Sequence, residues 1–236
     1  MATYNGGKYI REQLDSILCQ IGEKDEVIIS DDGSTDETIA VIKSINDPRI
    51  SLLHFCRDKQ GLLPINLVTT NFENALKNAS GDIIFMADQD DVWRKDKVKI
   101  CTDYLVNQGY DYIVSDCYIT DSDLNLISET RFDGSFTKNR WKALISPTPY
   151  QGSCAAFRRE VMNKALPFPK HIQSHDRWIG YIASFKFKYK IIPEKLIYYR
   201  RHDSNTSTAT AKSNSSLYYK VATRLTYITQ LIKRLF

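Results

Sequence analysis

The first half of the sequence alternates between two hydrophobic patterns, and this alternation restricts the fold more than any other feature. Some segments carry apolar residues at helical spacing, while others are short apolar runs typical of strands buried on both faces. The predicted order is helix 10–21, strand 27–29, helix 39–45, strand 50–55, helix 68–79, strand 82–87 and helix 95–107. Strands joined by helices of this length favour right-handed crossovers. We therefore expect an α/β fold, a single Rossmann-like domain with a mostly parallel central sheet and helices on both faces.

Two acidic clusters directly follow predicted strands. Asp31 and Asp32 come after the first buried strand, and Asp88, Asp90 and Asp91 come after the third. The carboxyl ends of parallel strands meet at one edge of a sheet, where ligands bind in such folds. The sequence therefore predicts that these distant clusters meet in one site.

The residues after the first acidic pair predict the start of a helix. Residues 34–37 are Ser-Thr-Asp-Glu, the pattern of a capping box. Turn formation and helix capping are also an alternative role for Asp31 and Asp32 themselves. Because Ser34 already supplies a cap in this interpretation, we expect the aspartates to contact a ligand.

The second acidic cluster contains a D-x-D arrangement, Asp88-Gln89-Asp90. Carboxylates hold hard divalent cations, and such a cation neutralises the charge that builds up on a diphosphate leaving group. A solvated turn is the alternative, because aspartate is common in turns. Three acidic residues between apolar runs repel one another, which favours a bound cation.

Three longer motifs follow one another along the first part of the chain. They are Met-Ala-Thr-Tyr-Asn-Gly-Gly at 1–7, Ile-Ser-Asp-Asp-Gly-Ser-Thr-Asp at 29–36 and Gly-Asp-Ile-Ile-Phe-Met-Ala-Asp-Gln-Asp-Asp-Val-Trp at 81–93. In this order and spacing they resemble the family 2 inverting glycosyltransferases with the GT-A fold. The resemblance implies transfer of a sugar from a UDP- or dTDP-sugar to a saccharide or lipid-linked acceptor, with Mg²⁺ or Mn²⁺ as cofactor. The family normally has several apolar residues before Thr3, so we expect a first strand that is short or truncated.

The resemblance also implies roles for individual positions. The donor-binding positions are Thr3, Tyr4, Asn5, Asp31, Asp32, Asp88, Arg200 and Arg201. The metal-binding positions are Asp88, Asp90 and His202, and the acceptor-side positions are Gln151, Gly152, His175 and Trp178. A plain surface histidine is the alternative for His202, and a simple turn is the alternative for Gly152.

Asp176 is the expected catalytic base, at the start of a helix predicted near 176–184. Inversion by direct displacement needs a base that takes a proton from the attacking hydroxyl on the face opposite the leaving group. An N-cap is the alternative role. Many family members have Glu-Asp here, and the His175-Asp176 pair of this chain resembles rhamnosyltransferase-like members.

The second half has weaker patterns, with short strands predicted at 112–115, 190–192 and 196–199. We expect a glycosyltransferase domain at 1–202, divided into a nucleotide-sugar half at 1–107 and an acceptor half at 108–202. A polar linker at 203–216 and a basic amphipathic helix at 217–236 follow. That helix is expected either to pack on the domain or to lie on an anionic membrane.

Composition excludes some classes of protein. No run reaches the roughly 18 to 20 apolar residues of a membrane span, and a net charge of +4 is too small and dispersed for nucleic-acid binding. The five cysteines form no C-x-x-C pair and are expected to be reduced and mostly buried. We expect a cytoplasmic enzyme, or one peripheral to the inner face of the cell membrane, that adds one sugar per encounter because the processive Gln-x-x-Arg-Trp motif is missing. A sugar nucleotidyltransferase and a non-catalytic carbohydrate-binding or scaffold protein are the alternatives.

Overall fold

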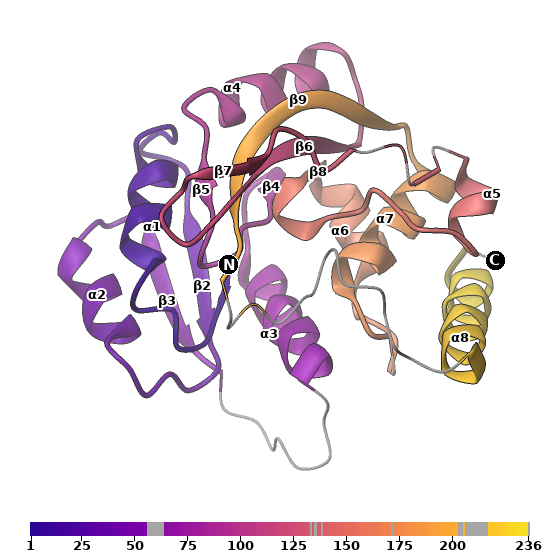
Figure 1. Ribbon diagram of the computed structural model, residues 1–236, viewed down its shortest axis with the longest axis horizontal. Helices are drawn as coiled ribbons and strands as arrows, with labels where there is room; N and C mark the ends of the chain where they lie inside the picture. The colour runs from indigo at the N-terminus through magenta and orange to yellow at the C-terminus, as the bar shows by residue number, and fades with distance from the viewer. Residues whose placement is uncertain are drawn as a thin grey trace.

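The computed structural model describes residues 1–55, 64–132, 134, 136–137, 139–170, 172–202, 205 and 217–235. Two β-sheets stand side by side, with helices packed around them (Figure 1). Buried apolar side chains from both sheets and from the surrounding helices join in one core, which includes Ile29, Phe157 and Trp178. Burial of each such side chain contributes about 1.5–3 kcal/mol to stability. The predicted linker at 203–216 lies outside the described residues except for Asn205.

The first sheet is parallel, with strand order β1-β2-β3. Its strands and their helices are β1 (Ala2–Thr3), α1 (Ile10–Leu18), β2 (Val27–Asp31), α2 (Thr38–Ile45), β3 (Ile50–His54) and α3 (Pro64–Asn78). This alternation confirms the prediction for the first half of the chain. The short β1 pairs with the carboxyl-terminal end of β2, so Thr3 lies opposite Asp31.

The second sheet is mixed, with strand order β4-β8-β6-β9-β5 and β7 paired to β6. Its strands are β4 (Ile83–Phe85), β5 (Val92–Trp93), β6 (Tyr112–Thr120), β7 (Leu126–Ser128), β8 (Ala155–Arg158) and β9 (Tyr189–Arg200). Only β6 and β9 run parallel among these described pairs. The mostly parallel sheet expected from the sequence is therefore confined to the first half, because β8 inserts antiparallel between β4 and β6.

The remaining helices cover the second sheet and one side of the molecule (Figure 1). They are α4 (Lys97–Thr102), which continues as a π-helical turn at Asp103–Asn107, α5 (Arg140–Ala143), α6 (Arg159–Ala165), α7 (His175–Lys186) and α8 (Leu217–Leu235). The helices predicted at 95–107, 176–184 and 217–236 are thus confirmed. Two short strands predicted at 190–192 and 196–199 are parts of β9, whose pairing with β6 is irregular between Ser115 and Tyr118.

The helix α8 packs on the domain with one face and exposes another. Tyr227 and Leu231 are buried in the main core. Arg234 donates to the carbonyls of Lys164, Ala165 and Leu166 at the end of α6, and so satisfies acceptors that the helix end leaves open. No helix of the described residues is long and apolar enough to cross a membrane.

Two local predictions need correction or refinement. Ser34 does not cap α2: its hydroxyl donates to Asp31 and accepts from the Asn5 N–H. The chain turns at Gly33, with φ 79°, and the carboxylate of Asp36 instead accepts from Thr38 N at 3.0 Å. Among the cysteines, Cys101, Cys117 and Cys154 are buried free thiols, Cys19 is exposed, and Cys56 lies outside the described residues.

Candidate active site

A cleft of about 1320 Å³ gathers most of the residues that the sequence analysis selected. The selected residues that line it are Thr3, Tyr4, Asn5, Asp32, Asp88, Asp90, Gln151, Gly152, His175, Asp176, Arg201 and His202. They come from loops at the ends of both sheets and from α7, so the predicted meeting of distant acidic clusters is confirmed. Asp31, Arg200 and Trp178 do not line this cleft.

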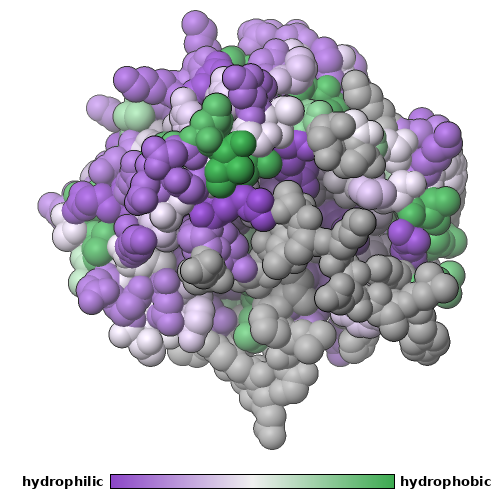
Figure 2. All heavy atoms as spheres, in the orientation of Figure 1, coloured by the Kyte–Doolittle hydropathy of each residue, from purple (hydrophilic) through white to green (hydrophobic). Residues whose placement is uncertain are grey.

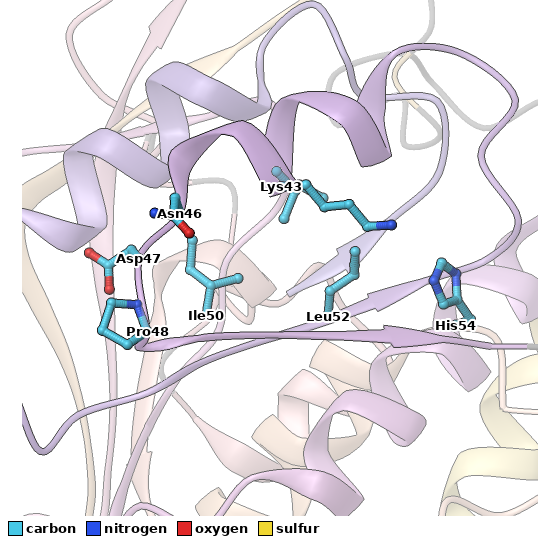
Figure 3. Close-up of a pocket in the computed structure, with 8 residues that line it drawn as sticks. Lys43, Asn46, Asp47, Pro48, Ile50, Leu52 and His54 are labelled. Carbon is cyan, nitrogen blue, oxygen red and sulfur yellow. The ribbon is translucent and has the colours of Figure 1, made fainter.

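A second hollow, of about 530 Å³, lies between α2 and β3 (Figure 3). Half of its lining is apolar, and the charged or titratable side chains are Lys43, Asp47 and His54. None of the selected residues belongs to it. The large cleft is therefore the candidate active site.

The first motif is tied directly to the D-x-D turn. Tyr4 N–H donates to the side-chain oxygen of Gln89 at 2.9 Å, and the Gln89 amide donates back to the Tyr4 carbonyl at 3.1 Å. A Cβ on Gly6 would lie 2.3 Å from this side-chain oxygen. A side chain at position 6 would therefore have to displace the Gln89 amide from Tyr4, whereas glycine lets the loop approach the turn this closely.

The two residues of the first acidic pair have different roles. Asp31 is 1% exposed, and its carboxylate accepts from Gly33 N at 3.0 Å and from Ser34 N at 2.8 Å. The alternative of turn formation is therefore correct for Asp31, because its carboxylate closes the turn that follows β2. Asp32, one residue further, lines the cleft. It remains the member of the pair that we expect to contact a donor.

Burial and the crowding of negative charge raise the pKa of two carboxyls in the second cluster, Asp88 and Asp91. Burial, followed by the negative charges of Asp90 and Asp176, raises the pKa of Asp88 to about 7. Burial and the charges of Asp90 and Asp88 raise the pKa of Asp91 well above its usual value. Asp91 is fully buried, and one of its oxygens accepts from Arg200 N at 3.1 Å. Asp88 and Asp90 thus face the cleft, whereas Asp91 supports the turn from below.

Asp90 and His202 meet across the cleft floor. His202 Nε2 lies 2.9 Å from Asp90 Oδ2, and both side chains are largely buried. Asn205 donates to the same carboxylate oxygen at 3.2 Å, and the Tyr9 ring lies 4.8 Å from the His202 ring. The sequence did not predict Asn205 or Tyr9 as site residues, because neither lies in a recognisable motif.

This pair offers part of a metal site. A carboxylate oxygen can bind either Mg²⁺ or Mn²⁺. An imidazole nitrogen favours the transition metal, Mn²⁺. Within the described residues, no three Asp, Glu, His or Cys side chains converge on one point. A cation held by Asp90 and His202 would need further ligands from outside these side chains, such as phosphate oxygens or water.

Arg200 stabilises the site and does not face it. Its guanidinium donates to the carbonyls of Asp90 at 2.9 Å and Ser122 at 2.5 Å and pairs with Glu12. Its side chain is 4% exposed. The prediction of a direct contact between Arg200 and the donor is therefore wrong, because protein acceptors already occupy the guanidinium. Arg201, the residue after the end of β9, lines the cleft.

The start of α7 forms the opposite wall. Asp176 accepts from Ser174 Oγ and from Arg177 N, the latter at 2.6 Å. His175 is 8% exposed and stacks on Phe72 at 4.1 Å between ring centroids. Burial lowers the pKa of His175, so its imidazole is neutral at pH 7. We expect it to shape the wall and not to carry charge.

Trp178, predicted on the acceptor side, does not line the cleft. It is 0% exposed, and its indole N–H donates to the Ala165 carbonyl at 2.9 Å. Two residues along a helix correspond to a rotation of about 200°, so Trp178 faces the core while Asp176 faces the cleft. The predicted acceptor-side role of Trp178 is wrong for this reason.

Gly152, which we expect on the acceptor side, lies close to the expected base Asp176. A Cβ at this position would lie 3.2 Å from His175 Nε2 and 3.4 Å from Asp176 Cβ. The next residue, Ser153, is held by Lys97, whose ammonium donates to the Ser153 carbonyl at 2.6 Å. Lys97 is fully buried and lies over the Trp93 ring.

Two supporting residues could have been found from their helical spacing. Lys97 stands four residues before Cys101, on the apolar face of its helix. Asn71 lies between Val68 and Ala75 on the apolar stripe of α3, and it donates to the Thr3 carbonyl at 3.2 Å. A polar residue inside an apolar stripe is the signal that both share.

The sequence of this cleft and its supporting elements matches a known family model. The model described as glycosyl transferase family 2 matches residues 1–166. The chain belongs to this family. An uncharacterized glycosyltransferase of Nostoc sp. is 26% identical over 227 residues, which are 91% of this chain and 67% of that protein.

Two relatives of this family member carry more specific names. The dTDP-rhamnosyl transferase RfbG of Shigella flexneri is 33% identical over 145 residues, which are 58% of this chain and 49% of that protein. The UDP-Glc:alpha-D-GlcNAc-diphosphoundecaprenol beta-1,3-glucosyltransferase WfaP of Escherichia coli is 31% identical over 121 residues, 50% of this chain and 45% of WfaP. This family 2 chain thus spans about half the length of both.

Solved structures confirm the GT-A fold of this family 2 chain. TarS of S. aureus, in complex with UDP-GlcNAc, has a TM-score of 0.71 at 18% identity, with 96% of this chain and 64% of the TarS chain covered. The mannosyltransferase PcManGT of Pyrobaculum calidifontis, in complex with GDP-Man and Mn²⁺, has a TM-score of 0.60 at 19% identity, with 98% and 62% covered. At these identities the likeness concerns the fold alone.

Proposed function

We propose that this chain transfers a sugar from a nucleotide diphosphate donor to an acceptor hydroxyl with inversion. One observation carries the proposal: Asp88 lies in one cleft with Asp90 and Asp176, close enough for both of their charges to raise its pKa. Asp90 and His202 suit the diphosphate end of a donor, and Asp176 suits the end where an acceptor enters. A nucleotide sugar extended between them would have its reacting carbon near Asp88.

The residues of the cleft have separate tasks in this mechanism. Asp32 borders the nucleoside, with Thr3 beside it in the cleft, since a carboxylate accepts from base N–H and ribose hydroxyl groups. Asp90 and His202 would hold a Mn²⁺ or Mg²⁺ ion, which supplies charge neutralisation for the departing diphosphate. Asp176 takes the proton of the attacking hydroxyl as the new bond forms on the opposite face of the sugar.

We propose dTDP-rhamnose or a UDP-hexose as the donor. The identity to RfbG and the His175-Asp176 pair support dTDP-rhamnose, and the identity to WfaP supports UDP-glucose. The name of WfaP also contains a diphosphoundecaprenol acceptor, so we propose a saccharide linked to a lipid carrier as the acceptor. This chain matches only about half the length of each relative. The proposal therefore concerns the catalytic domain that this chain forms, and not the whole of a longer protein.

A screen of nucleotide sugars tests this function. We expect dTDP-rhamnose or UDP-glucose, with Mn²⁺, to raise the melting temperature more than GDP-mannose and more than either nucleotide sugar without metal. At 100 times Kd a ligand stabilises by about 2.7 kcal/mol, which is several degrees for a protein of this size. Pyrophosphate release from a sugar phosphate and a nucleoside triphosphate would instead indicate a nucleotidyltransferase, and no response to any nucleotide sugar would contradict the proposal.

We also propose that the exposed face of α8 rests on an anionic membrane. Val221, Leu225 and Ile232 are 44%, 57% and 55% exposed along one stripe of this helix. Trp141 and Ile145 in and after α5 are 67% and 60% exposed, and α5 and α8 lie at the same side of the molecule (Figure 1). Apolar side chains gather at this right-hand edge in Figure 2.

The charges around this stripe favour anionic lipid over a protein partner of mixed charge. Residues 217–235 and 136–150 contain no aspartate or glutamate. Lys142 and Lys233 are exposed beside the apolar residues. Basic residues near a surface of anionic lipid contribute about 1 kcal/mol each, in addition to the inserted apolar area.

We expect the double substitution Leu225→Ser and Ile232→Ser to weaken vesicle binding by about 10-fold or more, since each apolar side chain contributes about 1.5–3 kcal/mol when buried. The measurement is co-sedimentation with phosphatidylglycerol vesicles and with phosphatidylcholine vesicles. Val106→Ser with Leu126→Ser is the matched control, because these residues are 50% and 54% exposed elsewhere on the surface. Equal losses in both double variants would refute the assignment of the α8 face.

A further inference from the structure

The segment just before α7 has an unusual hydrogen-bond arrangement. Ser174 stands at the N-cap position of α7 in an extended conformation, with φ −147° and ψ 116°. A serine at this position normally accepts from a free N–H of the first helical turn. Here the hydroxyl makes no such bond and donates to the Asp176 carboxylate instead. Ser174 therefore fixes the orientation of the expected base.

Ser174 is in turn held by a residue of α8. The Tyr227 hydroxyl accepts from Ser174 N at 2.9 Å and donates to the Ser174 carbonyl at 3.1 Å. Tyr227 is 2% exposed, and burial raises its pKa, so the phenol keeps the proton that it donates. One side chain thus binds both backbone groups of the residue that orients Asp176.

Other contacts press α8 against the same segment. The Gln173 amide donates to the Tyr219 hydroxyl at 2.5 Å. The Arg177 guanidinium lies 5.9 Å from the centre of the Tyr227 ring. The Tyr181 and Tyr227 rings meet edge-on, with 5.5 Å between their centroids. Residues 173–177 line the cleft, so α8 supports the wall of the cleft that carries the base.

We infer that Tyr227 is a positioning residue for glycosyl transfer, acting through Ser174 on Asp176. The inference rests on the proposed function, because it assumes that Asp176 takes the proton of the acceptor. It assigns α8 a part in the reaction that is separate from any contact with a membrane. Residues 173–177 and Tyr227, which form this contact, belong to the part of the chain that the structure describes.

Tyr227→Phe removes one oxygen and keeps the ring. We expect kcat for transfer from dTDP-rhamnose or UDP-glucose to fall about 10-fold, which corresponds to about 1.4 kcal/mol and to the loss of a typical hydrogen bond. The KM for the donor and the Kd for UDP with Mn²⁺ should stay within about 2-fold. Ser174→Ala should give a similar loss, and the double variant should lose little more, since both changes break the same chain of contacts.

Tyr181→Phe is the matched control. Tyr181 is also buried, lies against Tyr227 and donates its hydroxyl proton to the Ala143 carbonyl at 3.0 Å, away from Ser174. We expect Tyr181→Phe to lower the melting temperature as much as Tyr227→Phe without lowering kcat. Equal losses of kcat in the two variants would show a merely structural role and overturn the inference.

Asp176→Asn separates failure of this inference from failure of the proposed function. If this variant transfers sugar normally, the assigned base is wrong, and the role of Tyr227 is wrong with it. If the variant is inactive while Tyr227→Phe keeps full kcat, the proposed function stands and only the positioning role is refuted.

Discussion

Asp176→Asn should lower the rate of sugar transfer by about 10²–10⁴-fold, the usual contribution of a general base. The amide has nearly the shape of the carboxylate and can still accept from Ser174, but it cannot take a proton from the acceptor. Binding of UDP with Mn²⁺ should be unchanged, because the residues that we expect to hold the ion, Asp90 and His202, are retained and pair with each other. Steady-state transfer rates and calorimetric UDP titrations measure the two effects separately.

Glu160→Gln is the control for a charge at a helix start. Glu160 lies in the first turn of α6 as Asp176 lies in the first turn of α7, so both substitutions remove a favourable interaction with a helix dipole. Glu160 is exposed and outside the cleft. Normal transfer by the Asp176 variant, or an equal loss in the Glu160 variant, would remove Asp176 from the mechanism.

Asp90→Ala should abolish the response to metal. We expect turnover to fall by more than about 100-fold, since the loss of even an outer-shell partner of a metal ligand typically costs 10- to 100-fold. The rise in melting temperature that Mn²⁺ with UDP gives the unchanged protein should also disappear. This thermal readout does not depend on identifying the acceptor.

Asp82→Ala is the matched control for Asp90. Asp82 precedes the same short strand β4 whose carboxyl end leads to the D-x-D turn, and it is exposed. We expect full turnover and a full Mn²⁺ response from this variant. A Mn²⁺ response that survives Asp90→Ala would show that the ion binds elsewhere.

The general fold and the location of the cleft could be predicted because local patterns decide both. The apolar run at β2 and the acidic residues that follow it identify a strand end, and parallel strands bring such ends together. Asp32 and Asp90 could be assigned to the cleft from these local patterns alone, without knowledge of distant contacts. The same logic could not find β8 (Ala-Ala-Phe-Arg), whose first three residues are buried and which lies between β4 and β6.

Arg200 and Asp31 do not line the cleft, and the two cases have a common physical cause. Arg200 and Asp31 have the right chemistry for a donor, but other parts of the protein occupy their hydrogen-bonding groups: Glu12 and Ser122 for one, Gly33 and Ser34 for the other. Which partner a polar side chain takes depends on tertiary packing, which a single sequence does not display. The contact of Tyr227 with Ser174 spans 53 residues and belongs to the same class.

The close approach of Gly6 to Gln89 limits how the cleft can be altered. The loop that we expect to border the nucleoside and the turn that we expect to border the diphosphate are joined through this contact and the Tyr4–Gln89 hydrogen bonds, so a larger residue at position 6 must displace the Gln89 side chain. If these segments select the nucleotide as we propose, we expect a change of nucleotide to need changes in both segments. Engineering of donor choice should begin with paired libraries at positions 4–6 and 89, and single-site libraries there should return mostly inactive proteins.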